Sequence, residues 1–297
     1  MGIPSRILRA AGRHALVDGI PFQLPVYCRE SPALFAAFPV DLEKARALLP
    51  GNEIHPLRLW NTGLLIVSVM DYRNTSIGKY VEFSVAIACT RGRKPAPRLL
   101  PALLPWCYGT GQFVVELPVS TEISVKGGKG IWGMPKHQGS LDYRITEDTV
   151  SSQYDVDDQL GVRITIQRPR RAWLPLSVGA SNYCAYRGMI WKSTLYFKAK
   201  AGLAMGGKGR AELLIGDHPS LAPLRALGIG KDPLFVAFIP QAEGVLDDHV
   251  EGWFYSEPGP ILSRPEGFES VVNLGLGQTW PPPPTAAGRG PASGVNP

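Results

Sequence analysis

Hydrophobic and polar residues alternate along much of this chain, as they do in β-strands that have one buried face. The clearest case is the run Arg-Ile-Thr-Ile-Gln at residues 163–167, where every second residue is apolar. Runs rich in β-branched and aromatic residues predict further strands. These predicted strands cover residues 63–72, 80–90, 112–119, 140–145, 150–156, 162–167 and 193–198. A continuous apolar run at 234–240 predicts a fully buried strand, and residues 22–27 predict an extended segment.

Helical signals are few and short. Asp41 is placed to cap a helix over residues 42–49, which Pro50 and Gly51 would end. A second short helix is predicted over residues 219–227. Many strands and few helices predict a mainly β (α+β) fold, in which a mainly antiparallel sheet curls into a cone-shaped β-barrel.

The composition suits one large domain with short flanking segments. Of the 297 residues, 44% are hydrophobic and 19% are charged, which is enough apolar material for a sizeable core. We expect an N-terminal arm over residues 1–19, a barrel domain over 20–260 and a disordered, proline-rich tail over 281–297. No apolar run approaches the length of a membrane span, so no membrane partner is expected.

The charge is mildly positive, at +6, and comes partly from two basic clusters at residues 91–98 and 168–171. Prolines lie in or next to both clusters, and we interpret the clusters as solvated loops. Without interleaved aromatic residues or a known binding module, they predict no nucleic-acid partner. The positive balance is compatible with an acidic small-molecule substrate.

The cysteines carry no metal or disulfide signature. They are widely scattered, and no pair has the spacing of metal ligands. The four are Cys28, Cys89, Cys107 and Cys184. We expect a reduced, cytoplasmic protein that needs neither a metal nor another cofactor.

The strongest chemical candidate is Lys136, which follows a glycine-rich stretch starting at residue 127. A solvated lysine is a hydrated cation and a poor nucleophile, whereas a dry or cationic environment favours the neutral amine that attacks carbonyl groups. Ile131, Trp132 and Met134 are placed to supply a dry wall. We therefore predict an apolar, glycine-shaped loop over residues 127–139 that holds one reactive lysine.

Three segments together resemble the acetoacetate decarboxylase superfamily. Gly-Met-Pro-Lys at residues 133–136 is similar to the Pro-Lys signature of that family, in which the lysine forms a Schiff base with a keto acid. Ile-Gly-Lys-Tyr-Val-Glu at 77–82 is similar to its Gly-x-Tyr-x-Glu segment, and residues 217–224 with 238–243 are similar to its C-terminal third. The resemblance spans about residues 20–248 and implies a cone-shaped β-barrel that is expected to be a homo-oligomer.

The resemblance also assigns roles to single residues. It implies that Lys136 is the nucleophile and that Glu82 is the acid/base group, so both are predicted to be catalytic. Five further residues are predicted to contact the substrate: His137, Lys129, Trp132, Met134 and Tyr80. The implied activity is that of a lyase, which decarboxylates a small β-keto acid or a related carbonyl substrate through a Schiff base.

Several departures from the family pattern leave other reactions open. Decarboxylases of this family are a standard example of a lysine activated beside a second cation, and His137 stands where the second lysine is expected. Gly130 and Val67 stand where the family has glutamates. One alternative is aldolase-dehydratase chemistry on the same imine, with Val67 suiting a less anionic substrate. Another is a non-catalytic, ligand-binding barrel that has kept only the fold.

Overall fold

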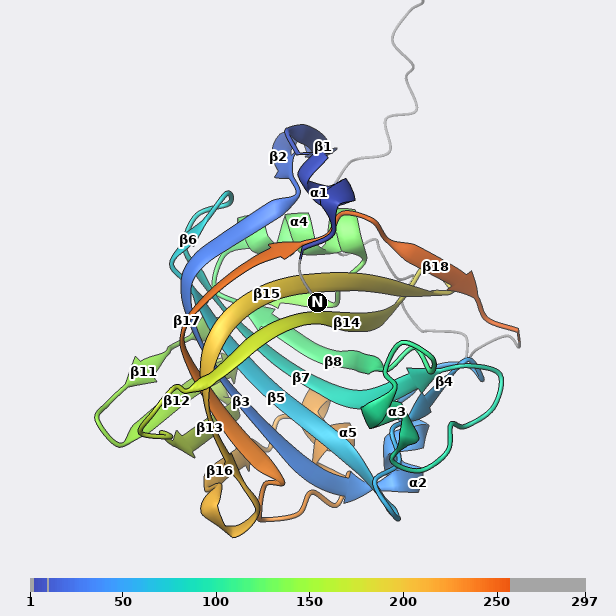
Figure 1. Ribbon diagram of the computed structural model, residues 1–297, viewed down its shortest axis with the longest axis vertical. Coiled ribbons are helices and arrows are strands. Elements are labelled where there is room, and N and C mark those ends of the chain that lie inside the picture. The colour runs from blue at the N-terminus through green and yellow to red at the C-terminus, as the bar shows by residue number, and fades with distance from the viewer. Residues whose placement is uncertain (1–2, 10, 257–297) are drawn as a thin grey trace, which may run out of the picture.

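A closed barrel of seven strands forms the centre of the protein, whose computed structural model describes residues 3–9 and 11–256. The barrel strands are β3 (Val26–Asp41), β5 (Thr62–Tyr72), β7 (Tyr80–Arg91), β8 (Gly111–Val119), β14 (Leu174–Tyr186), β15 (Met189–Met205) and β17 (Phe235–Leu246). They pair in the order β7-β5-β3-β17-β15-β14-β8, and β8 pairs back to β7 (Figure 1). The β14–β8 pairing is parallel, and the other pairings around the ring are antiparallel. The predicted mainly β, mainly antiparallel barrel is confirmed.

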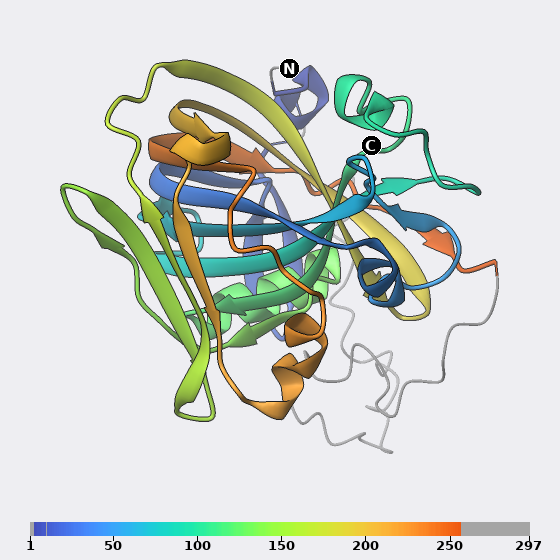
Figure 2. The same cartoon turned by 90° about the horizontal axis from the view of Figure 1, so that it is seen from below.

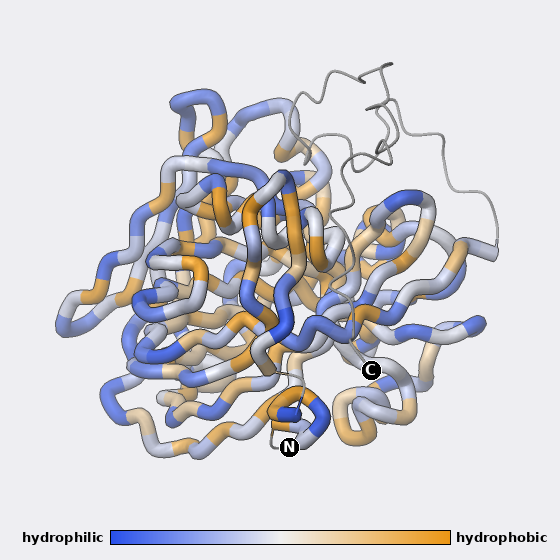
Figure 3. The backbone as a smooth tube through the Cα atoms, turned by 90° about the horizontal axis from the view of Figure 1, so that it is seen from above, coloured by the Kyte–Doolittle hydropathy of each residue, from blue (hydrophilic) through white to orange (hydrophobic). Residues whose placement is uncertain are grey.

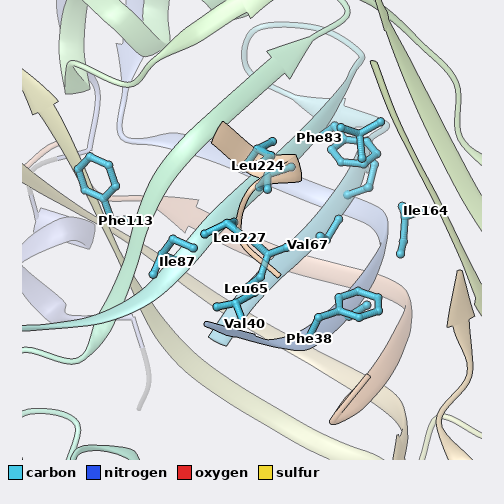
Figure 4. Packing of buried hydrophobic residues seen from close by; sticks show 14 of the residues in the cluster. Phe38, Val40, Leu65, Val67, Phe83, Ile87, Phe113, Ile164, Leu224 and Leu227 are labelled. Carbon is cyan, nitrogen blue, oxygen red and sulfur yellow. The ribbon is translucent and has the colours of Figure 1, made fainter. Parts of the chain in front are cut away.

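A smaller sheet lies beside the barrel (Figure 2). Its strands are β10 (Ser140–Leu141), β11 (Arg144–Ile145), β12 (Thr149–Val156), β13 (Gln159–Gln167) and β16 (Ala211–Ile215). The largest hydrophobic core packs β3, β5 and β7 against this sheet and against α5 (Ala222–Arg225), with Val67 and Ile164 among its members (Figure 4). Hydrophobic and hydrophilic residues alternate along many strands (Figure 3), as expected for strands with two different faces.

The remaining elements are short, and several of them pair with barrel strands. They are α1 (Ser5–Arg9), β1 (Arg13–Val17), β2 (Ile20–Leu24), α2 (Leu42–Ala47), β4 (Ile54–Pro56), β6 (Asn74–Thr75), α3 (Leu100–Leu103), α4 (Glu122–Trp132), β9 (Lys136–Gln138), η1 (Gly206–Lys208), η2 (Pro219–Leu221) and β18 (Glu251–Phe254). None of the helices in the described part of the chain combines the length and the apolar character needed to cross a bilayer.

Most predicted strands are present, with differences at their ends. The predicted strand at 140–145 is two short strands, β10 and β11, and the one at 193–198 is the middle of β15. Sequence patterns missed β14 and most of β3. The β3 segment contains two prolines and three alanines, which weaken a strand signal, and its pairing with β5 and β17 overrides that local preference.

One predicted domain limit falls inside a hairpin, and the others fall outside the described residues. Residue 19 lies in the turn of the β1–β2 hairpin, so the predicted arm contributes one strand of that hairpin. The hairpin packs on α4, where Val17 meets Gly130. The last residues of the predicted barrel domain, 257–260, and the proline-rich tail at 281–297 lie outside the described residues.

The predicted glycine-rich loop is wrong over residues 127–132, which belong to helix α4. Glycine lowers helix propensity, but here each glycine lets a neighbouring segment approach the helix. Gly127 faces the Phe22 ring and Gly128 faces the side chain of Lys136. Gly133 ends the helix in the left-handed conformation, with φ 63°, and so turns the chain back toward the barrel.

Candidate active site

Lys136 reaches the barrel interior by crossing one face of α4. After the turn at Gly133, the chain runs through Pro135 into β9, which pairs parallel to β8 with Lys136 opposite Leu117. The aliphatic part of the lysine side chain lies against Gly128, where any Cβ would stand 2.8 Å from its Cε. Only 4% of Lys136 is exposed. The absence of a side chain at Gly128 therefore leaves room for the Lys136 side chain to pass along the helix.

The amine of Lys136 ends between a carboxylate and a hydroxyl group. Its Nζ lies 2.7 Å from Oε2 of Glu82 and donates a hydrogen bond of 3.0 Å to Oγ of Ser124. Ser124 is one helical turn before Gly128, so both lie on the face of α4 that Lys136 crosses. Glu82 belongs to the barrel strand β7, whereas Ser124 belongs to the helix. The structure thus brings the two predicted catalytic residues together.

Two stacked tyrosines form a wall next to this pair. Tyr72 and Tyr80 lie opposite each other on β5 and β7, with ring centroids 4.5 Å apart. The Lys136 amine lies 5.3 Å from the centre of the Tyr80 ring. Burial, followed by the nearby Glu82 charge, raises the pKa of both phenols well above the usual range. Both phenols therefore remain protonated near neutral pH.

Two small adjoining cavities, with volumes of about 80 and 40 Å³, lie beside the Lys136–Glu82 pair. Tyr72, Glu82, Met134, Asn182 and Leu195 line both cavities, and Lys136 lines the smaller one. Among the described residues around the two cavities, Lys136 and Glu82 are the charged ones. The remaining walls are mostly apolar. The arrangement suits a small carbonyl compound with little or no additional charge.

The second polar feature of the cavities is an amide pair. Gln112 donates a hydrogen bond of 2.8 Å from its Nε2 to Oδ1 of Asn182, at the point where β8 and β14 pair in parallel. Both side chains line the larger cavity. Sequence reasoning missed this pair, together with Ser124, Gly128 and Tyr72. The four-residue spacing of Ser124 and Gly128 would have been informative only if residues 122–132 had been predicted as a helix.

Of the residues expected to contact the substrate, Met134 and Tyr80 line the cavities, whereas Trp132 and Lys129 line neither of them. The Trp132 indole is buried and donates a hydrogen bond of 2.7 Å to the backbone oxygen of Asp247. Lys129 is half-buried on α4. Val67, which was expected to suit a less anionic substrate, lines neither cavity and packs in the core shared with the smaller sheet (Figure 4). The neighbouring Ser68 lines the larger cavity instead.

His137 also lies outside the two cavities, where it contacts Glu116 of β8. Its Nε2 is 3.9 Å from Oε2 of Glu116. Burial, aided by the charge of Lys129 and opposed by a hydrogen bond with the Pro135 backbone, lowers the pKa of His137. Burial raises the pKa of Glu116 to about 7. Both shifts favour the neutral forms, and His137 lies outside the cavity that Lys136 lines.

The raised pKa of Glu116 predicts that this carboxyl group destabilises the fold as the pH rises. Between pH 4.5 and about 7, the unfolded chain releases the Glu116 proton while the folded chain keeps it. The free energy of unfolding then falls with pH, by a total on the order of 3 kcal/mol. We expect Glu116→Gln to match the wild type near pH 4.5 and to be more stable by up to about that amount at pH 8. Denaturant unfolding at both pH values measures this difference.

A matched control is Glu122→Gln, which changes an exposed carboxylate on α4. Its effect should stay within about 0.5 kcal/mol at either pH. An equal change in stability at pH 4.5 and pH 8 would contradict the assignment.

No metal site is apparent within residues 3–9 and 11–256, where no group of three or more histidine, cysteine or acidic side chains is placed to hold an ion. The fold and the site together define a β-barrel protein with a lysine–carboxylate pair in a small internal cavity. The sequence matches the acetoacetate decarboxylase (ADC) family over residues 11–183. This is more than half of the chain, which therefore belongs to that family and is an acetoacetate decarboxylase-like enzyme.

Solved structures of low sequence identity share the fold. The acetoacetate decarboxylase from Legionella pneumophila subsp. pneumophila str. Philadelphia 1 is 17% identical, with a TM-score of 0.58, over 79% of this chain and 91% of that one. A second acetoacetate decarboxylase is 16% identical, with a TM-score of 0.60, over 81% and 92%. The enduracididine biosynthesis enzyme MppR, complexed with pyruvate, is 13% identical, with a TM-score of 0.55, over 77% and 90%. No curated protein sequence matches the chain.

Proposed function

We propose that this protein is an enzyme in which Lys136 forms a Schiff base with a small carbonyl substrate. The observation that carries the proposal is the buried Lys136 amine, 2.7 Å from the Glu82 carboxylate, at the wall of a largely apolar cavity. Glu82 accepts a proton from the Lys136 ammonium group, and the neutral amine attacks the carbonyl carbon. Loss of water from the adduct leaves an iminium ion. Ser124 holds the amine in place through its hydrogen bond.

Decarboxylation is the first candidate for the reaction that follows, with a β-keto acid as the substrate. The bond between the α-carbon and the carboxylate breaks, its electrons move toward the iminium nitrogen, and carbon dioxide leaves. Formation of water has already used the proton that Glu82 accepted, so the α-carbon of the enamine takes up a proton from solvent, which Glu82 binds and passes on. Hydrolysis of the imine releases the ketone and restores Lys136. Membership of the acetoacetate decarboxylase family supports this candidate.

Aldol-type condensation and dehydration on the same imine is the second candidate. It is favoured by the charges around the cavities, where the described residues include no second cation to hold a substrate carboxylate. MppR, a structural neighbour, has been solved with the condensation product of pyruvate and imidazole 4-carboxaldehyde. In this reaction the enamine carbon attacks an aldehyde instead of taking up a proton.

Borohydride trapping tests the shared imine step. The protein is incubated with acetoacetate, pyruvate or a panel of other keto acids and aldehydes, reduced with borohydride, and weighed by intact mass spectrometry. We expect a stable adduct that is absent in Lys136→Ala and present in Lys126→Ala, which removes an α4 lysine paired with Glu122. Absence of an adduct with every compound would favour a non-catalytic binding barrel. Release of carbon dioxide then separates decarboxylation from condensation.

A further inference from the structure

Exposed apolar side chains gather on and next to helix α3, whose place in the fold is labelled in Figure 1. We call this cluster the α3 tip; its members are Trp60, Leu99, Leu100, Leu103, Leu104 and Trp106. Leu103 is 76% exposed, Trp60 68% and Trp106 57%. The turn that carries Trp60 lies beside α3, since the backbone N–H of Leu99 donates to the oxygen of Arg58 at 3.3 Å. Such gatherings of exposed apolar side chains mark interaction surfaces.

The charged side chains in the segments that carry the α3 tip have one sign. Arg93, Lys94 and Arg98 are exposed in the loop that leads into α3, and Arg58 lies next to Leu99. No aspartate or glutamate occurs at residues 54–70 or 83–115. The carboxylate of Glu53, just before the first of these stretches, accepts hydrogen bonds from Asn52 and Ser256. The tip therefore combines protruding leucine and tryptophan side chains with a cationic border.

We propose that the α3 tip binds the surface of a bilayer containing anionic phospholipids. Leucine side chains gain free energy by entering the boundary between headgroups and acyl chains, and tryptophan is favoured at that depth. Lysine and arginine beside them attract the negatively charged headgroups. This role concerns a surface separate from Lys136 and does not depend on the proposed reaction. It revises the expectation from the sequence that the protein has no membrane partner.

A polar pocket beside the tip offers room for part of a headgroup. It has a volume of about 170 Å³ and is lined by Trp106 and Cys107 of the tip segment together with Thr110. Arg91 also lines it, and its guanidinium group stacks 4.0 Å from the centre of the Trp253 ring. A phosphate group entering this pocket would meet a further fixed cation and a hydroxyl group.

Other occupants of the tip are disfavoured by its charge and shape. If two copies of the chain met tip to tip, like charges would come together. A nucleic acid would use the cations but would leave Leu103 and Leu104 without an apolar environment, since single-strand binding relies on aromatic stacking. A lipid surface with anionic headgroups satisfies both the cationic border and the aliphatic centre.

Vesicle flotation with the full chain tests the proposal. We expect the protein to float with vesicles of 70% phosphatidylcholine and 30% phosphatidylserine, and much less with pure phosphatidylcholine. Added salt should weaken this binding by screening the headgroup charges. The double variant Arg93→Glu Arg98→Glu should bind anionic vesicles more than about tenfold more weakly, because each basic residue near the surface contributes about fivefold.

The apolar part of the tip has a matched control. Leu103→Ser Trp106→Ser should lose flotation, whereas Trp173→Ser, which changes a 66% exposed tryptophan outside the tip, should float like the wild type. The substitutions in both variants remove exposed side chains only, and circular dichroism verifies that each variant is folded. If neither the wild type nor the Trp173 variant floats with anionic vesicles, or if Leu103→Ser Trp106→Ser floats as well as they do, the proposal is overturned.

A fluorescent probe on Cys107 gives an independent readout. Cys107 is the exposed cysteine of the four, since Cys28, Cys89 and Cys184 are buried, so a polarity-sensitive dye labels one position next to Trp106. Its emission should shift to shorter wavelength with anionic vesicles and remain unchanged with RNA. A shift that instead follows protein concentration without lipid, together with a larger mass in light scattering, would assign the tip to self-association and refute the lipid role.

Discussion

Replacing Glu82 by glutamine is expected to slow proton exchange at the substrate by about 10²- to 10⁴-fold, the usual contribution of a general acid–base group. The amide has the shape of the carboxylate and can still bond to Lys136, whose Nζ lies 2.7 Å from Oε2 of Glu82. It cannot take up the proton that the imine chemistry releases. The readout is exchange of the α-protons of pyruvate or acetone for deuterium, followed by NMR, because imine formation makes these protons acidic whichever reaction the enzyme completes.

The Glu82→Gln variant also separates two possible roles of Glu82, namely holding the Lys136 amine in position and transferring protons. Borohydride adducts should still form in Glu82→Gln, at a reduced rate, since Ser124 continues to hold the Lys136 amine. Glu116→Gln is the matched control, because Glu116 lies on the barrel wall outside both cavities. Exchange at the wild-type rate in Glu82→Gln would rule out Glu82 as the acid/base group, and a slowed Glu116→Gln would place that group on the outer face instead.

The site could be predicted from the sequence as far as its local motifs extend. Lys136 and Glu82 belong to short segments with recognisable neighbours, and their meeting in one cavity follows from the closure of the barrel. Runs rich in β-branched and aromatic residues likewise predicted β5, β7 and β8, and the alternation at 163–167 predicted β13. The local sequence of each of these strands is therefore enough to predict it.

The missed features depend on packing between distant segments. Helix α4 contains three glycines within residues 127–130, which argue against a helix when only propensity is considered. These glycines let Phe22, Val17 and Lys136 pack closely against the helix, and only the folded structure shows these contacts. The outward direction of Val67 and the meeting of Gln112 with Asn182 similarly follow from barrel register, which a single strand does not encode.

Gly128 offers the sharpest test of this packing argument. In Gly128→Ala the new Cβ would meet the Lys136 side chain, 2.8 Å from its Cε, and the flexible lysine must move aside. Alanine also improves helix propensity by about 1 kcal/mol, so the folded state should be retained. We expect imine formation and deuterium exchange to fall by about 10²-fold, since a misplacement of about 1 Å at a reacting group has effects of that size.

The matched control is Gly130→Ala, two residues further along the same helix. It gains the same propensity, but its Cβ would meet Val17 of the N-terminal hairpin, 2.6 Å from Cγ1, and leaves Lys136 untouched. Any loss in Gly130→Ala should therefore appear in the melting temperature and not in the rate of adduct formation. If Gly128→Ala forms the borohydride adduct as fast as the wild type, the lysine does not need the channel along α4. Of the two glycines, Gly128 contacts the Lys136 side chain and Gly130 does not. If both variants lose activity together, the cause is therefore a general disturbance of the helix.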